Sequence, residues 1–186
     1  MITYETPGGV NTDATLKLAM DTARERGLDL VLASSTGETA LKLAKLAEEE
    51  AFPNKIVVVR HVYGMEEPGV NDMPEAIAQS LRAHGITLVT AAHALSGGER
   101  GISKKFGGVS PVEVMAATLR MFGQGVKVCV EIAIMALDCG AIPYGKPVVA
   151  VGGTAYGSDA ACIVTPNYTA NLLDTKIHEI LCKPHL

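Results

Sequence analysis

Five short apolar segments recur along the chain and are separated by longer segments of mixed polarity. They are rich in β-branched residues and apolar at almost every position, which is typical of strands that a parallel sheet buries on both faces. The predicted strands are residues 30–33, 56–59, 86–89, 148–151 and 162–164.

The segments before and between the first three of these strands carry apolar residues at helical spacing. They predict helices over residues 12–26, 37–50 and 73–84, and Gly27 and Gly85 stand where two of these helices would end. Strands that alternate with helices in this way indicate an α/β layer fold.

The middle third departs from this alternation. The segment Ser110-Pro111-Val112-Glu113 forms a capping box with proline at the first helical position, which predicts a helix to about residue 122. A second, strongly apolar helix is expected over residues 126–139. Residues 94–108 contain five glycines and are predicted to form a long loop. The tail from residue 169 fits either a helix or a terminal strand.

Composition narrows the class of protein. A chain of 186 residues with 48% hydrophobic residues fits one domain, residues 1–186. The net charge of -4 and only 16 Lys plus Arg argue against a nucleic-acid partner. No apolar stretch reaches the roughly 20 residues that span a bilayer, and the first residues lack the pattern of a secretory signal. We therefore expect a cytoplasmic protein with no membrane partner.

The four cysteines lie far apart and form neither a C-x-x-C pair nor a Cys/His pair at the spacing of metal ligands. We therefore predict no metal site and interpret them as small buried residues, with one reactive thiol as the alternative. They are Cys129, Cys139, Cys162 and Cys182.

A run of hydroxyl residues follows the first predicted strand and opens the next helix. Its members are Ser34, Ser35, Thr36, Gly37, Glu38 and Thr39. The N–H groups of a first helical turn have no acceptor within the helix, and the helix dipole favours negative charge there, so this run predicts a phosphate site. An ordinary Ser/Thr helix cap is the alternative. The carboxylate of Glu38 would disfavour an anion if it faced the pocket.

A second loop rich in glycine follows the strand over residues 148–151. Its members are Gly152, Gly153, Thr154, Ala155, Tyr156, Gly157, Ser158 and Asp159. Alone, this loop also fits a connector between hairpin strands, in which glycines supply positive φ. If the five strands lie in the order 3-2-1-4-5, strands one and four are neighbours whose connections leave in opposite directions. Both loops would then face one crevice, which predicts a ligand that carries a phosphate.

The first loop and the helix after it, Ala40-Leu41-Lys42-Leu43-Ala44-Lys45, resemble the Thr-x-Ser-Gly-x-Ser/Thr loop and helix of the pyruvate kinase C-terminal domain. In that family the loop holds a phosphate of an allosteric sugar bisphosphate, and a later loop, similar in position to residues 152–159, closes over the ligand. The resemblance covers the order of elements over about residues 12–166. It implies a three-layer α/β fold with a mainly parallel, five-stranded sheet in the order 3-2-1-4-5. The chain lacks the kinase's (β/α)₈ barrel, so the kinase reaction is not implied.

Three longer sequence segments are similar to segments of a group of stand-alone archaeal and bacterial proteins of this fold. They are residues 92–97, 105–108 and 119–127. Members of that group look like binders of flavin mononucleotide (FMN), so the resemblance implies FMN as a cofactor. It also suggests a homodimer, because the related kinase domain assembles through neighbouring surfaces. Tyr63, Tyr156 and Phe106 are the few aromatic candidates to stack on a flavin ring.

Two histidines and a buried carboxylate are further candidates. His61 and His93 follow the second and third predicted strands and would therefore lie at the end of the ligand away from the phosphate. Three roles are open for them: proton transfer, hydrogen bonding to the ligand, or a purely structural role. Glu131 either pairs with Lys127 one turn earlier on its helix or lines the crevice as an acid. Four cations are available for a phosphate, none of them assigned to the site: Arg60, Arg100, Lys104 and Lys105.

The leading interpretation is therefore a ligand-binding or regulatory domain that holds a phosphorylated small molecule. The alternative is an enzyme, either a flavin-dependent oxidoreductase or an enzyme that acts on a phosphorylated metabolite, with His93 or Glu131 as the proton carrier. An interaction module without a ligand is the third class. The sequence assigns no catalytic residue.

Overall fold

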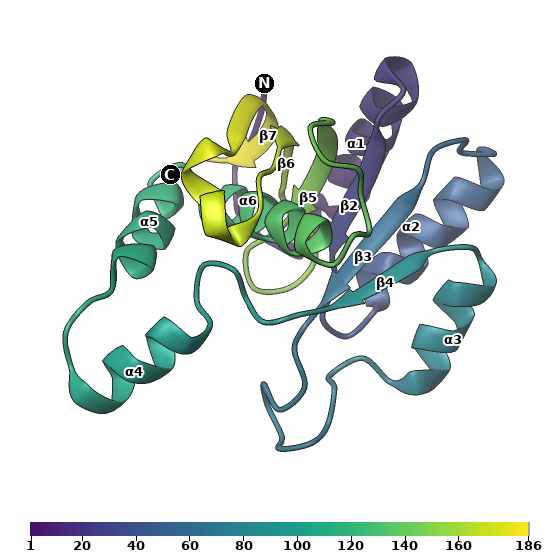
Figure 1. Cartoon of the computed structure of the whole chain (residues 1–186). Coiled ribbons are helices and arrows are strands. Elements are labelled where there is room, and N and C mark those ends of the chain that lie inside the picture. Colours follow the sequence, from purple (N-terminus) through teal and green to yellow (C-terminus); the bar gives the residue numbers. More distant parts are fainter. Residues whose placement is uncertain (186) are drawn as a thin grey trace.

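A mixed sheet of seven strands, in the order β1-β7-β6-β5-β2-β3-β4, forms the centre of the structure, a computed structural model that describes residues 1–185 (Figure 1). The strands are β1 (Ile2–Tyr4), β2 (Asp29–Ala33), β3 (Ile56–Arg60), β4 (Thr87–Thr90), β5 (Val148–Gly152), β6 (Ala160–Thr165) and β7 (Lys176–Pro184). Four neighbours, β5, β2, β3 and β4, run parallel. Strand β6 runs antiparallel to both β5 and β7, and β1 runs parallel to β7.

The predicted α/β class is confirmed, but the predicted sheet of five strands was too small. The sheet has seven strands, and its order as a whole differs because β7 and β1 extend it beyond β6; the five predicted strands themselves lie in the predicted relative order, β4-β3-β2-β5-β6. Strand β1 has only three residues, too few to give a pattern. Much of β7 is partly exposed and polar, so its sequence suits a helix nearly as well.

Helices cover both faces of the sheet. Helices α1 (Thr12–Arg26), α2 (Glu38–Glu49) and α3 (Glu75–Ala83) pack on one face, and α6 (Gln124–Asp138) packs on the other, with α5 (Pro111–Arg120) beside it (Figure 1). Side chains alternate between the faces along each strand. Val58 accordingly belongs to the core under α1, α2 and α3, whereas Val57 and Val59 belong to the core under α6.

The bounds of α1 and the start of α5 agree with their sequence signals, whereas α6 begins at Gln124, two residues before the predicted start at residue 126. Helix α1 has the predicted bounds, with Gly27 directly after it. The capping box that was predicted at α5 is present, because Ser110 Oγ accepts the Glu113 N–H at 3.4 Å and Glu113 Oε2 accepts the Ser110 N–H at 2.9 Å. The terminal helical turns are therefore fixed by local hydrogen bonds as well as by packing.

Residues 94–108 do not form the long loop that was predicted. They include α4 (Gly98–Phe106), a helix with no buried residue, whose two glycines and four charged residues are typical of a loop. Helix α4 and the loop between β3 and α3 project from the same, lower side of the molecule (Figure 1). Two short 3₁₀ helices, Gly9–Asn11 and Thr169–Asp174, complete the described elements.

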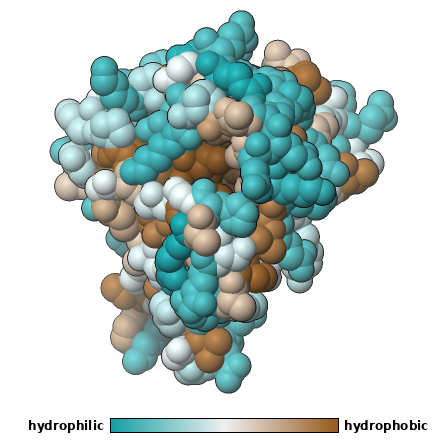
Figure 2. Space-filling model, turned by 90° about the vertical axis from the view of Figure 1, so that its right-hand side faces the viewer, coloured by the Kyte–Doolittle hydropathy of each residue, from teal (hydrophilic) through white to brown (hydrophobic). Residues whose placement is uncertain are grey.

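The surface over α2 and α3 is largely hydrophilic, and its hydrophobic side chains gather in recesses between hydrophilic ones (Figure 2). None of the helices within residues 1–185 combines the length and the apolar character that a membrane crossing requires.

Candidate functional site

A cavity of about 330 Å³ opens where β2, β3 and β4 end and the β5–β6 loop begins. This volume lies at the lower end of the roughly 300–1,000 Å³ that is usual for small-molecule sites. Parallel strands place their carboxyl ends at one edge of a sheet, which is where α/β folds bind ligands. The cavity therefore lies where the sequence predicts a crevice.

The cavity wall brings together both predicted loops and both predicted histidines. The predicted site residues in the wall are Ser34, Ser35, Thr36, Glu38, Thr39, His61, His93, Gly153 and Gly157. Five others do not reach it: Gly37, Gly152, Thr154, Ser158 and Asp159. The two loops are thus adjacent, but only part of each faces the cavity.

The first loop forms the N-terminus of α2. Ser34 Oγ accepts the Ala40 N–H at 3.3 Å and so caps the helix, whereas the N–H groups of Glu38 and Thr39 have no acceptor among residues 1–185. Gly37 has a φ of +94°, and a Cβ there would lie 2.5 Å from Ile77 Cγ2. Gly37 therefore allows α2 to pack closely against α3, and the free amides beside it face the cavity end of the helix.

Arg60, the last residue of β3, is a buried positive charge in the wall of the cavity. Its side chain is 7% exposed; Nε donates to Thr90 Oγ1 at 2.7 Å, and Nη1 has no acceptor among the described residues. No carboxylate of residues 1–185 pairs with it. A guanidinium stays ionised in proteins, and an unpaired buried charge is costly. An anion in this cavity would compensate that charge.

Strand alternation places Arg60 on the same side of the sheet as Val58, which is the side that α2 covers. The guanidinium and the N-terminus of α2 therefore share one end of the cavity. We call this end the anion end; it comprises Arg60 and residues 34–39.

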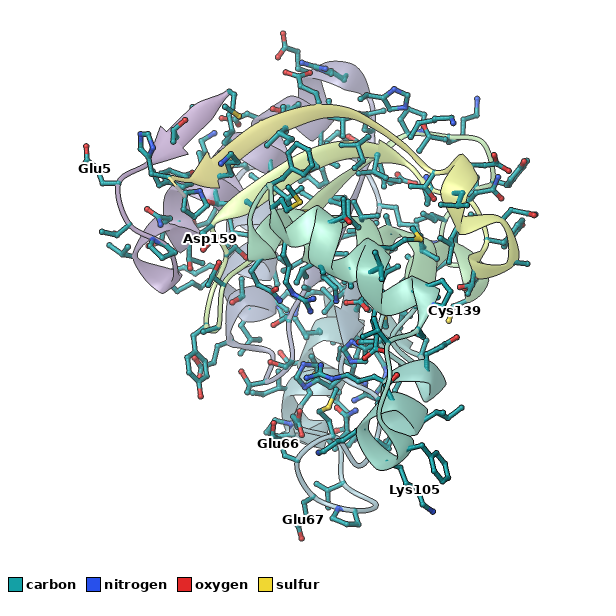
Figure 3. All side chains as sticks on the ribbon, turned by 90° about the vertical axis from the view of Figure 1, so that its left-hand side faces the viewer. Glu5, Glu66, Glu67, Lys105, Cys139 and Asp159 are labelled. Atoms are coloured by element: carbon teal, nitrogen blue, oxygen red, sulfur yellow. The ribbon has the colours of Figure 1, made fainter. Side chains whose placement is uncertain are left out.

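Three other cations belong to the cavity wall, one of them the buried Lys127. Arg100, Arg120 and Lys127 line the cavity from α4, α5 and α6, and Arg120 Nε donates to Gln124 Oε1 at 2.8 Å. Lys104 and Lys105 are not part of the wall; Lys105 projects at the lower end of the molecule (Figure 3). With Glu38 and Glu131 as the carboxylates in the wall, positive charge exceeds negative charge there.

Glu131 and Lys127 form a buried ion pair on α6, and both residues are 3% exposed. Of the two predicted alternatives, Glu131 therefore pairs with Lys127, and it also belongs to the cavity wall. The second carboxylate oxygen accepts the Leu95 N–H at 3.0 Å and the Ser96 hydroxyl at 3.4 Å. Both of these donors lie after β4. The pair therefore fixes the segment that carries His93 to the surface of α6.

Burial acts against both charges of this pair. It lowers the pKa of Lys127, in spite of the neighbouring carboxylate. Burial would likewise raise the pKa of Glu131, but the neighbouring His93 imidazole, 3.7 Å away, and the ammonium of Lys127 outweigh it and lower that pKa to about 2. The Glu131 carboxylate is therefore ionised at neutral pH.

His61 is held by a carboxylate that the sequence analysis did not find. His61 Nδ1 lies 2.5 Å from Asp72 Oδ2, and the His61 and His93 ring centroids are 5.5 Å apart. His93 Nδ1 lies 3.7 Å from Glu131 Oε2. Asp72 belongs to the loop between β3 and α3, whose path no periodic pattern reveals, so the sequence held no signal for this pair.

Ser158 and Asp159 belong to the scaffold of the second loop. Both are fully buried, and Asp159 Oδ2 accepts the Gly8 N–H at 2.7 Å while the Ser158 N–H donates to Thr12 Oγ1 at 3.0 Å. Figure 3 shows Asp159 inside the molecule, beside the N-terminal segment. These bonds tie the loop to residues 8–12 and leave the exposed Tyr156 at the cavity.

No three His, Cys, Asp or Glu side chains within residues 1–185 come together as a set of metal ligands. Of the cysteines, Cys139 is exposed and the other three are buried. The cavity therefore offers backbone amides, guanidinium groups, hydroxyls and imidazoles to a ligand.

Residues 13–164 match the sequence profile of the family described as pyruvate kinase, alpha/beta domain. The match spans the first loop, both histidines, Glu131 and the second loop, and so contains the whole cavity.

Proposed function

Because the chain belongs to the family of the pyruvate kinase alpha/beta domain, we propose that it is a ligand-binding domain that holds a phosphorylated small molecule in this cavity. FMN is the specific ligand that we propose. The proposal names no kinase activity, since the matched family covers the α/β domain alone.

One observation supports a phosphate as the group that binds at the anion end. Arg60 is buried, keeps an Nη1 without an acceptor among residues 1–185, and lies on the same side of the sheet as the free amides of Glu38 and Thr39. A phosphate offers several strong acceptors and a negative charge, so one group would satisfy all of these donors.

Support for FMN comes from the resemblance given by residues 92–97, 105–108 and 119–127 and from the character of the wall. Beyond the anion end, the wall includes the apolar side chains of Val59, Ile132 and Met135, and Tyr156 stands at the opening. A ligand with a phosphate at one end and a flat apolar ring at the other suits such a cavity.

The direct test is the absorbance spectrum and mass of what co-purifies with the protein, followed by titration of ligand-free protein with FMN and with riboflavin. Quenching of flavin fluorescence gives both affinities. We expect FMN to bind more tightly, because riboflavin lacks the phosphate.

Arg60→Met sharpens the test. Loss of a charge-assisted contact of about 1.5–3 kcal/mol should weaken FMN binding roughly 10- to 150-fold and leave riboflavin binding unchanged. Arg26→Met is the matched control, because Arg26 makes an exposed ion pair with Glu179 on the surface. Equal FMN affinity in Arg60→Met and wild-type protein would place the phosphate elsewhere, and failure of any flavin to bind would reject FMN.

A further inference from the structure

We propose that His61 is a catalytic base, oriented by Asp72, that removes a proton from the non-phosphorylated part of a phosphate-ester substrate. The substrate class is a phosphorylated hydroxy ketone or hydroxy aldehyde. This inference rests on the proposed function, because the substrate would use the same anion end of the cavity as FMN.

The pair of His61 and Asp72 has the arrangement of an oriented base. Asp72 Oδ2 lies 2.5 Å from His61 Nδ1, and the two side chains are 11% and 34% exposed. A carboxylate at Nδ1 favours the tautomer in which that nitrogen carries the proton, so Nε2 keeps its lone pair. The imidazole is thus prepared to accept a proton at the nitrogen that Asp72 does not use.

The segment that carries Asp72 is itself fixed to the end of β3. Asn71 Nδ2 donates to the His61 carbonyl at 2.6 Å, and Asn71 Oδ1 accepts the Met73 N–H at 3.1 Å. Met73 is buried in the core at 2% exposure. Asp72 is therefore held between two anchored neighbours, which makes it a positioning residue for the imidazole.

The anion end and the base occupy different sides of the cavity. Arg60 shares the side of the sheet that α2 covers, whereas His61 lies with its ring 5.5 Å from His93, which in turn lies beside Glu131 of α6. A substrate whose phosphate contacts Arg60 would extend its other end toward His61. A phosphate ester that reacts at a carbon away from its phosphate needs one part of the site to bind the phosphate and another part to carry out the proton transfer.

The proton-transfer step balances without a redox partner. His61 Nε2 takes the proton from the carbon next to the carbonyl, and the electron pair of that C–H bond forms the C=C bond of an enolate. The carbonyl oxygen takes the negative charge, which Arg100 and Arg120 at the cavity wall offset. Return of a proton from His61 to carbon regenerates the carbonyl compound, and in D₂O it returns a deuteron.

The test uses the purified full chain in D₂O with three probes: dihydroxyacetone phosphate, ribulose 5-phosphate and fructose 6-phosphate. Proton NMR and mass spectrometry report the exchange of carbon-bound hydrogen, and displacement of FMN reports binding. We expect at least one probe to bind and to exchange, and FMN to inhibit that exchange. His61→Asn should lower the exchange rate by roughly 10²- to 10⁴-fold, the usual contribution of general acid–base catalysis.

Asp72→Asn separates positioning from structural support. It should lower kcat at nearly unchanged KM, because the amide favours the wrong imidazole tautomer, and the ¹⁵N spectrum of His61 should show the proton moving from Nδ1 to Nε2. The matched control is His84→Asn, at the exposed end of α3, which should leave exchange unchanged.

Two outcomes would overturn the inference: probes that bind without exchange, and exchange that persists in His61→Asn. Either of these leaves the proposed binding function intact. If neither the probes nor FMN bind, the anion end itself is wrong, and both proposals fail.

Discussion

Replacing Glu131 by alanine removes one half of the buried ion pair and tests whether this pair stabilises the fold. The change leaves the Lys127 ammonium, in a residue 3% exposed, without its carboxylate. It also removes the acceptor of the Leu95 N–H. Both losses destabilise the folded state, because a buried charge and a buried donor need partners.

Two independent routes give the size of the effect. The carboxyl pKa falls from its ordinary 4.5 to about 2 on folding, and at roughly 1.4 kcal/mol per pKa unit this corresponds to about 3 kcal/mol. Removal of one partner from a buried pair typically costs about 3–5 kcal/mol. A loss of about 3 kcal/mol should lower the Tm of a chain of this size by about 6–12 °C.

The pH dependence follows from the direction of the pKa change. A carboxyl group whose pKa is lower in the folded state adds stability above the unfolded pKa of 4.5 and loses it as the pH falls toward 2. Roughly 1 kcal/mol should remain at pH 3. The difference between wild-type and Glu131→Ala protein should therefore shrink between pH 5 and pH 2.

Urea denaturation at pH 7 and pH 3 measures these differences. The double variant Lys127→Met, Glu131→Leu is the control, because replacing both charges with apolar groups is often close to neutral; burial already lowers the pKa of Lys127. A loss below 1 kcal/mol in Glu131→Ala at pH 7, or a double variant as unstable as the single one, would refute the reasoning.

Four further outcomes follow from the structure. Ligand-free Arg60→Met should be at least as stable as wild type in thermal denaturation, since it removes an unpaired buried charge; a loss above about 2 kcal/mol would make its bond to Thr90 structurally important. Gly125→Ala should cost about 1–3 kcal/mol, because its Cβ would lie 2.6 Å from two buried neighbours. Gly101→Ala, with open space around it, should instead stabilise α4 by about 0.5–1 kcal/mol. Ellman's reagent should label one thiol, Cys139, in the native chain and four after unfolding; rapid labelling of more would contradict the burial of the others.

The elements that the sequence predicts well are those with strong local signals. The capping box at Ser110 and the full apolar segments of β2, β3 and β5 agree with the structure. Helix α4 escaped prediction because its two glycines and four charged residues are typical of a loop, and β1 because a strand of three residues leaves no periodic pattern. The position of β1 depends on its pairing with β7, at the other end of the described chain.

The same distinction applies to the site. A hydroxyl run that follows a buried strand and opens a helix predicts the loop of residues 34–39, since this signal is local. Whether Arg60 is buried or solvated depends on which side of β3 it takes and on its neighbour Thr90, and the partner of His61 depends on the path of a loop. Likewise, Asp159 looks like a ligand-binding residue until its bond to Gly8, 151 positions away in the sequence, is seen.

The pairing of β1 with β7 affects how the protein matures during synthesis. The loop that carries Tyr156 is anchored to residues 8–12, and β1, just before them, pairs with β7, residues 176–184. A nascent chain on the ribosome can pair β2 with β3 and β4 early, but β5 joins β2 only after residue 152 has been made, and β1 has no neighbour to pair with until β7 has left the exit tunnel. We therefore expect ligand affinity to arise only after residues 176–184 have emerged, when the β2, β3 and β4 segments have long been available to pair.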